Sequence, residues 1–292
     1  MRIASLLPAA TEIVAALGAA ERLVAVTFEC AAEAREHAPV VVDTALPHGL
    51  APGEIDAWVR DRAARGLPMY ELDRPALAAL APDLILTQDL CQVCALPAGT
   101  VEEACRLIGT DAEVLSLDPH TLDEVLSSIE SVGRAAGVAR AAATLVGDLR
   151  ARLDVVEQAV ADRPRPRVLM LEWTDPPFLP GHWVPELVSR AGGTPVGGSA
   201  GGRSVAAEWD DLPQADVVVV APCGLGLEAA QEQSPTVAAR LPGVPLLAID
   251  SGRLVVQPGP SLVDGVEALA WALHPDAVPE PPAGRVAWIS AR

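Results

Sequence analysis

The sequence alternates short apolar runs with alanine-rich stretches from one end to the other, and this alternation restricts the fold more than any other feature. Short runs of leucine and β-branched residues are typical of strands buried on both faces, and the stretches between them are typical of helices. The pattern predicts an α/β fold with mostly parallel sheets covered by helices. The predicted strands lie at residues 3–7, 23–26, 40–42, 84–88, 114–117, 168–173, 217–220, 246–249 and 254–256.

Two predicted helices separate the first set of strands from the second. Apolar residues at helical spacing run from Leu122 to Val132, and similar spacing recurs through residues 139–161. A helix of about 23 residues at about 1.5 Å per residue is roughly 35 Å long, which is enough to join two lobes. The proline-rich segment 163–167 then ends it. We therefore expect an N-terminal lobe at 1–120, connecting helices at 121–162 and a C-terminal lobe at 163–292.

The two halves share a motif in which an aspartate precedes an apolar strand and a cysteine follows it. Asp83 and Cys91 flank the first such strand, and Asp216 and Cys223 flank the second. Internal similarity of this kind indicates a duplicated unit. We expect two related lobes that face each other across a cleft.

Three segments carry a resemblance to a known family: SLLPAATE at residues 5–12, LAPDLI at 80–85 and DPPF at 175–178. Through them the whole chain resembles the class III periplasmic binding proteins, especially those that bind cobalamin and ferric chelates. The resemblance implies two Rossmann-like lobes with parallel sheets, joined by a long and rigid backbone helix, and a ligand held between the lobes.

The resemblance also implies an ABC transporter partner, on which such proteins dock through an acidic residue of each lobe. The first-lobe position falls at Pro75 in this chain, and Asp210 is the nearest counterpart in the second lobe. Half of the docking pair is therefore missing, which argues against a transporter partner. The sequence also looks like a signal-less subgroup in which cysteines and the GHW motif at 181–183 accompany the shared fold.

Charge and hydropathy exclude several kinds of partner. With 21 basic and 39 acidic residues, the chain has a formal net charge of −18, which repels nucleic acid and anionic lipid surfaces. No apolar run reaches the length of about 18 residues that a membrane-spanning helix needs. The first apolar run is too short for a signal peptide and ends at Pro8. We therefore expect a cytoplasmic protein that binds no nucleic acid and does not insert into membranes.

Four of the five cysteines follow predicted strands, where open parallel sheets bind their ligands. These four are Cys30, Cys91, Cys94 and Cys223. Cys91 and Cys94 form a CxxC, whose spacing allows two thiolates to bind one metal or to form a disulfide. Thiolates favour zinc, copper(I) or an iron–sulfur cluster, and His182 is a further candidate ligand. The alternative is that these cysteines pack under loops, as we expect for Cys105 in its apolar stretch.

The densest group of unusual side chains lies between residues 172 and 183. Trp173, Phe178 and Trp183 are three of the nine aromatic residues in the chain, and aromatic faces suit a flat ligand such as a corrin. His182 could coordinate a metal, act as an acid and base near neutral pH, or fix its loop. Glu172, at the end of a strand, is a further candidate ligand-binding residue.

Other polar features have weaker interpretations. Glu29 beside Cys30 could pair with a cation or tune the thiol, and Glu186 is expected to cap the helix that follows it. The glycine-rich segment 192–202 lacks the ending of a phosphate loop and is interpreted as a flexible crossing segment. The remaining histidines show no ligand spacing; they are His37, His48, His120 and His274.

These features favour a non-catalytic binding protein for a cobalamin-like corrinoid or another metal chelate. A cytosolic metalloprotein or enzyme remains the alternative, with a thiolate site that holds zinc or an iron–sulfur cluster. The chelate hypothesis explains the aromatic group, whereas the thiolate hypothesis explains the cysteines.

Overall fold

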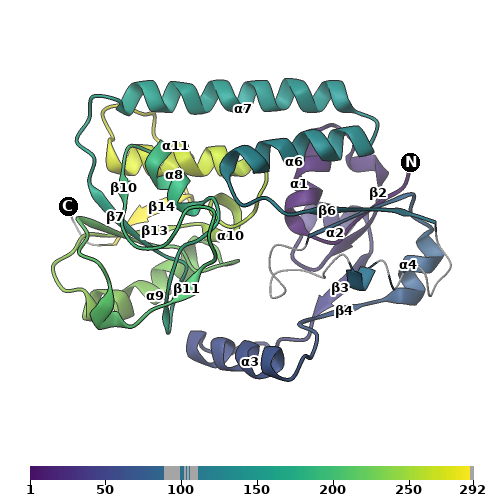
Figure 1. The fold of residues 1–292 in the computed structure, drawn as a ribbon, viewed down its shortest axis with the longest axis horizontal. Helices are drawn as coiled ribbons and strands as arrows, with labels where there is room; N and C mark the ends of the chain where they lie inside the picture. The colour runs from purple at the N-terminus through teal and green to yellow at the C-terminus, as the bar shows by residue number, and fades with distance from the viewer. Residues whose placement is uncertain (89–98, 102, 104, 106–110, 290–292) are drawn as a thin grey trace. The chain divides into compact units, whose positions relative to one another are not determined.

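The computed structural model describes residues 1–88, 99–101, 103, 105 and 111–289. The chain divides into two compact units, each of which we describe by itself. Unit 1 comprises Met1–Pro119 and Glu124–Gly147, and unit 2 comprises His120–Asp123 and Asp148–Arg292. Each unit contains a mainly parallel sheet with helices packed on it (Figure 1), so the predicted α/β fold is confirmed.

The sheet of unit 1 has the strand order β4-β3-β2-β1-β5-β6. All neighbours are parallel except β3 and β4. The strands are β1 (Ile3–Ser5), β2 (Leu23–Thr27), β3 (Val40–Thr44), β4 (Tyr70–Leu72), β5 (Leu84–Gln88) and β6 (Glu113–Leu117). Every residue of β1 and β5 is buried, as expected for central parallel strands.

The helices of unit 1 begin where the sequence offers start signals. Proline occupies the first turn of α1, α3 and α4, and the Asp73 carboxylate accepts a hydrogen bond from the Ala76 amide (2.9 Å) to cap α4. The helices described before β5 are α1 (Pro8–Ala16), α2 (Ala32–His37), α3 (Pro52–Ala64) and α4 (Arg74–Leu80), with a short 3₁₀ helix η1 (Ala20–Arg22). Cys105 is 5% exposed and belongs to the core of this unit, which confirms its prediction as a buried thiol.

The sheet of unit 2 has the order β10-β7-β12-β13-β14, with only β13 and β14 antiparallel. Its strands are β7 (Arg167–Leu171), β10 (Thr194–Pro195), β12 (Val217–Val220), β13 (Leu246–Ile249) and β14 (Val286–Trp288). A small antiparallel sheet adds β8 (Trp173–Thr174), β9 (Pro177–Leu179) and β11 (Val205–Ala206). The helices are α8 (Val184–Arg190), α9 (Leu227–Arg240), α10 (Ser251–Leu254) and α11 (Ser261–Leu273), with the 3₁₀ helix η2 (Trp209–Asp211).

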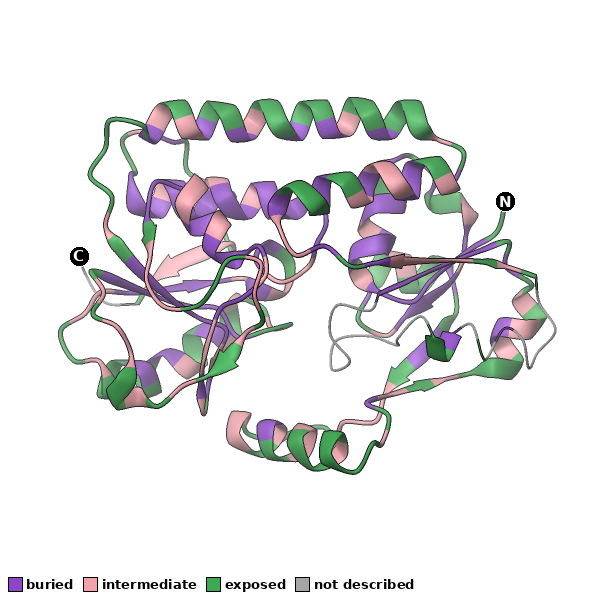
Figure 2. Cartoon of the chain, viewed as in Figure 1, coloured by how far each residue is buried: buried purple, intermediate pink, exposed green. Residues whose placement is uncertain are grey.

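The two connecting helices are α6 (Leu122–Ala135) and α7 (Ala139–Val160). The predicted long helix is thus confirmed as α7, and the boundary between the units falls within it. Its buried residues recur every three or four positions, and Figure 2 shows exposed residues between them. No helix in the described part of the chain combines the length and the apolar character needed to cross a membrane.

The shared motif of the two halves has the same structural role in both units. The Asp83 carboxylate accepts a hydrogen bond from the Arg2 amide (2.7 Å), at the entrance to β1. The Asp216 carboxylate accepts a hydrogen bond from the Arg167 amide (2.7 Å), at the start of β7. In each unit an aspartate before one strand therefore fixes the start of its parallel neighbour, which supports the inference of a duplicated unit.

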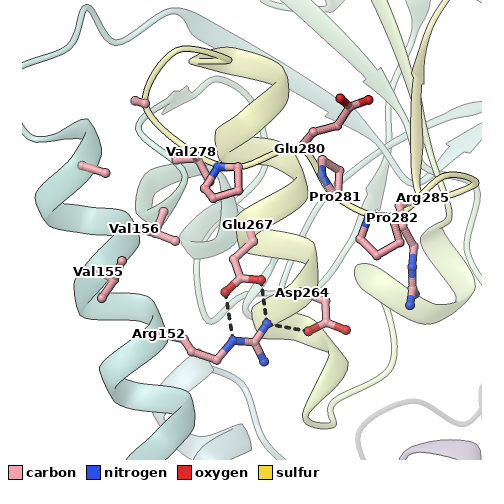
Figure 3. Close-up of a pocket in the computed structure, with 13 residues that line it drawn as sticks. Arg152, Val155, Val156, Asp264, Glu267, Val278, Glu280, Pro281, Pro282 and Arg285 are labelled. Carbon is pink, nitrogen blue, oxygen red and sulfur yellow. Dashed lines mark hydrogen bonds and ion pairs between the residues drawn. The ribbon is translucent and has the colours of Figure 1, made fainter.

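Arg152 attaches the second half of α7 to α11 within unit 2. Its guanidinium donates to Glu267 (2.9 and 2.6 Å) and to Asp264 (2.6 Å), as Figure 3 shows. The hydrogen bond to Glu267 is the main cause that raises the pKa of Arg152 above its ordinary value. Two carboxylates thus hold one side chain of the long helix in a fixed position.

The predicted strand at 254–256 is wrong. Leu254 ends the short helix α10, and the amides of Val255 and Val256 both donate to the Ser251 carbonyl (3.1 Å each). Leu254 and Val255 are fully buried, and a short buried apolar run cannot be assigned to strand or helix from its periodicity alone.

Gly265 provides a test of the packing between α10 and α11. A Cβ at this position would overlap the Leu254 carbonyl oxygen, whereas a Cβ at the exposed helical Gly147 would meet nothing within 4 Å. We expect Gly265→Ala to destabilise the protein by about 1–3 kcal/mol through overpacking. The matched control Gly147→Ala should stabilise it by about 0.5–1 kcal/mol. Urea unfolding measures both, and equal effects of the two substitutions would contradict the described packing.

Candidate functional site

The carboxyl ends of β7 and β12 form the topological switch point of unit 2. From β7 the chain reaches β10 on one side and later returns to β12 on the other side. Hydrogen bonding between β7 and β12 continues past both strands, because the Ala221 amide donates to Leu171 (2.9 Å) and the Cys223 amide donates to Glu172 (2.8 Å). Open parallel sheets bind ligands at such a point, so Glu172 and Cys223 occupy the expected position.

Glu172 is held by a side chain that lies just after the glycine-rich segment 192–202. It is 7% exposed, and its carboxylate accepts a short hydrogen bond from the Ser204 hydroxyl. Two residues further on, the Thr174 hydroxyl donates to the Gln233 side-chain oxygen of α9 (2.6 Å). These contacts fix polar side chains around the carboxyl end of β7.

Trp173 and Phe178 lie opposite each other in the hairpin of β8 and β9. Phe178 also pairs with Ala206 of β11 on its other side. Both aromatic residues are half-buried, and the Phe178 carbonyl accepts a hydrogen bond from the Glu172 amide (3.0 Å), so the hairpin is anchored beside Glu172. Trp173 and Phe178, two of the three residues of the predicted aromatic group, therefore lie in the hairpin that follows β7.

His182 is held in a left-handed backbone conformation, with φ of 49°. Its amide donates to the Gly202 carbonyl (2.6 Å), and the Gly201 amide donates back to the His182 carbonyl (2.8 Å). A Cβ at Gly181 would overlap the backbone of Arg203 and Ser204. The glycines of the segment predicted to be flexible therefore serve close backbone packing against the GHW motif.

Trp183 and Glu186 fasten this motif to the rest of unit 2. Trp183 is 3% exposed, and its indole N–H donates to the Val255 carbonyl (2.8 Å), so the ring packs in the interior. Glu186 lies in the first turn of α8, as expected, but its carboxylate accepts from the Leu122 amide (2.9 Å) at the start of α6. The Glu186 carboxylate therefore accepts a hydrogen bond from a first-turn amide of α6 rather than of its own helix α8.

The thiols of Cys30 and Cys223 have opposite environments. Cys223 is exposed, whereas Cys30 in unit 1 is 2% exposed and its sulfur contacts the Thr11 hydroxyl (3.1 Å). Burial raises the pKa of the Cys30 thiol above its ordinary value. Desolvation raises the pKa of neighbouring Glu29 to about 7. The Glu29 side chain also keeps an exposed surface.

The shared thiolate site stays a prediction. Cys91 and Cys94 lie outside the described residues, and Cys30 and Cys223 belong to different units. Among the described residues, no three His, Cys, Asp or Glu side chains are grouped so that they could hold a metal ion.

A groove of about 390 Å³ lies elsewhere in unit 2 (Figure 3). Its walls are α7, α11 and the proline-rich segment before β14, and its lining includes Arg152, Val156 and Val278. None of the predicted site residues lines it. We place the candidate site at the switch point rather than in this groove, because the switch point gathers the polar and aromatic side chains that recognise a ligand.

Sequence reasoning missed Ser204, Gln233 and His120. Ser204 lies shortly after Gly201 and Gly202, whose backbones contact His182. This glycine pair is the one feature of the sequence that could have indicated Ser204. Gln233 and His120 have no local motif. The ring of His120 lies 5.7 Å from that of His182 between centroids, a contact that spacing in the sequence could not indicate.

The contrast between the two thiols predicts selective labelling. In a short exposure to N-ethylmaleimide at neutral pH, Cys223 should react at least about tenfold faster than Cys30, because burial and a raised pKa both slow the reaction of Cys30. Mass spectrometry of the two cysteine-containing peptides measures each rate separately. Equal rates in the folded protein, or faster labelling of Cys30, would contradict the described environments.

Comparison with solved structures finds the same fold. A periplasmic heme-binding protein from Pseudomonas aeruginosa is 23% identical, with a TM-score of 0.68 over 100% of this chain and 98% of the other. The periplasmic heme-binding protein HutB of Vibrio cholerae is 19% identical, with a TM-score of 0.67 over 94% and 99%. The periplasmic vitamin B12 binding protein BtuF of Vibrio cholerae is 20% identical, with a TM-score of 0.61 over 93% and 96%.

The sequence itself gives a second, independent comparison. A search of curated protein sequences found no match. A family model described as "Periplasmic binding protein" matches residues 3–248, which include all three sheets apart from β14 and the last residue of β13. Together with the shared fold, this match shows that the chain belongs to the periplasmic binding protein family.

Proposed function

We propose that this chain is a non-catalytic binding protein for a metal tetrapyrrole, a cobalamin-like corrinoid or a heme. The observation that carries the proposal is the switch point of unit 2, where aromatic and polar side chains gather at the carboxyl end of β7. Trp173 and Phe178 are half-buried aromatic residues of the hairpin that follows Glu172, and the Glu172 carboxylate accepts from the Ser204 hydroxyl. Flat, partly apolar ligands with polar edges bind to surfaces of this composition.

The net charge of the chain and one exposed cation also bear on the class of ligand. The net charge of −18 opposes binding of polyphosphates such as free nucleotides. Next to Ser204, the exposed Arg203 offers a cation that could pair with a carboxylate on the ligand edge. A ligand with a broad apolar face and few acidic groups fits this combination better than a nucleotide does.

Similar proteins support the same ligand class. Proteins with the same fold are heme-binding or vitamin B12-binding periplasmic proteins. Their sequence identity to this chain is 19–23%, so they support the class of ligand and not one compound.

Absorbance titrations with hydroxocobalamin and with hemin test the proposal. We expect saturable binding of at least one of them and much weaker binding of ATP. Trp173→Ala should weaken chelate binding about tenfold, because losing about 1.4 kcal/mol of aromatic contact corresponds to that factor.

Trp209→Ala is the matched control, since it removes an equal indole from η2, which precedes the amino end of β12. It should leave the affinity unchanged, and circular dichroism should show both variants folded. Absence of saturable binding for both chelates, or equal losses in the two variants, would overturn the proposal.

A further inference from the structure

Two histidines that are far apart in the sequence form a close pair in unit 2. The rings of His120 and His182 have centroids 5.7 Å apart and planes inclined by 40°. His120 precedes α6, and His182 precedes α8, so two separate segments supply the imidazoles. Both residues are only half-exposed.

Backbone contacts fix the backbone of His182. A positive φ is uncommon for residues other than glycine, and it persists only where neighbouring structure determines it. Here the paired hydrogen bonds with Gly201 and Gly202 bracket His182, and the backbone at Gly181 packs so closely on Arg203 and Ser204 that a Cβ would overlap them. His182 is therefore held before any ligand arrives.

The segment that carries His120 is fixed to the same framework. The Glu186 carboxylate accepts from the Leu122 amide (2.9 Å). Leu122 lies two residues after His120, and Glu186 lies four residues after His182. Trp183, adjacent to His182, is hydrogen-bonded to the Val255 carbonyl (2.8 Å). One set of contacts thus anchors the two segments that carry the imidazoles, as a preorganised donor pair requires.

We infer that His120 and His182 form a binding site for a divalent first-row transition metal ion such as Ni²⁺, Co²⁺ or Zn²⁺. With a metal–nitrogen bond of about 2.0 Å and about 1.2 Å from nitrogen to ring centre, two imidazoles on one ion have centroids roughly 4.5 Å apart at 90° and roughly 6.4 Å apart at 180°. The observed 5.7 Å lies inside this interval. Neutral imidazole is a preferred ligand of these ions, and the net charge of −18 attracts cations.

Two protein ligands leave other coordination positions of the ion open to water or to a small chelator. The inference does not depend on tetrapyrrole binding at the switch point, since either activity can fail while the other remains. It also differs from a purely structural aromatic pair, which would predict loss of stability on substitution without any metal dependence.

Nickel titration of the metal-free protein tests this site. Ni²⁺ should raise the Tm of the unmodified protein by mass action and broaden the ring-proton NMR signals of His120 and His182 before those of the other histidines. His120→Gln and His182→Asn should each lower Ni²⁺ affinity by about tenfold or more, and the double variant should lose little beyond either single one. Asparagine at 182 keeps a residue that tolerates the left-handed backbone.

The double variant His37→Gln/His48→Gln is the control, since both residues are exposed histidines of unit 1. It should bind Ni²⁺ as the unmodified protein does. His120→Gln leaves the strained position intact, so it tests the site even if substitution of His182 disturbs the loop. Unchanged Ni²⁺ affinity in His120→Gln, or early broadening confined to other histidines, would overturn the inference.

Discussion

The hydrogen bonding between β7 and β12 is the interaction on which the rest of unit 2 depends. It begins where Asp216 holds the Arg167 amide and continues through four paired positions to the Cys223 amide on Glu172. Because this pairing extends past the strands, it sets the register of the two loops that leave the sheet. The side chains at the switch point are therefore positioned by the core sheet rather than by the loops alone.

Close backbone packing also positions the loop that carries His182. Glycines in two segments allow contact that any side chain would prevent: Gly181 packs on Arg203 and Ser204, and Gly198 packs on Pro180. The same contact brings the Ser204 hydroxyl to Glu172. The aromatic hairpin, the buried carboxylate of Glu172 and the loop of His182 thus form one connected framework. A substitution in one part should therefore alter the conformation of the others.

Much of this architecture could be predicted from the sequence, for reasons that apply to specific elements. The run 217–220 is apolar throughout and the run 84–88 begins with three apolar residues, so both are recognisable as buried strands, and the residues that follow them lie at a sheet edge. The strand predicted at 254–256 was wrong because a buried helical turn has the same apolar composition. Two-residue strands such as β8 and β11 carry too little pattern to be recognised.

Side-chain contacts between distant segments could not be predicted. The pair of His120 and His182 and the bond from Leu122 to Glu186 depend on how α6 and α8 begin, which no local spacing records. The aromatic character of Trp183 predicts contact with a ligand, and within unit 2 its ring is 3% exposed and its indole N–H donates to the Val255 carbonyl.

Hydrogen–deuterium exchange with and without a saturating tetrapyrrole tests most directly whether the switch point of unit 2 is the binding surface. Peptides that cover residues 172–183 and 221–226 should gain protection when ligand is added. Peptides that cover 152–159 and 277–285, which line the groove beside α7, should exchange unchanged. Protection confined to the groove, with no change at 172–183, would contradict the account.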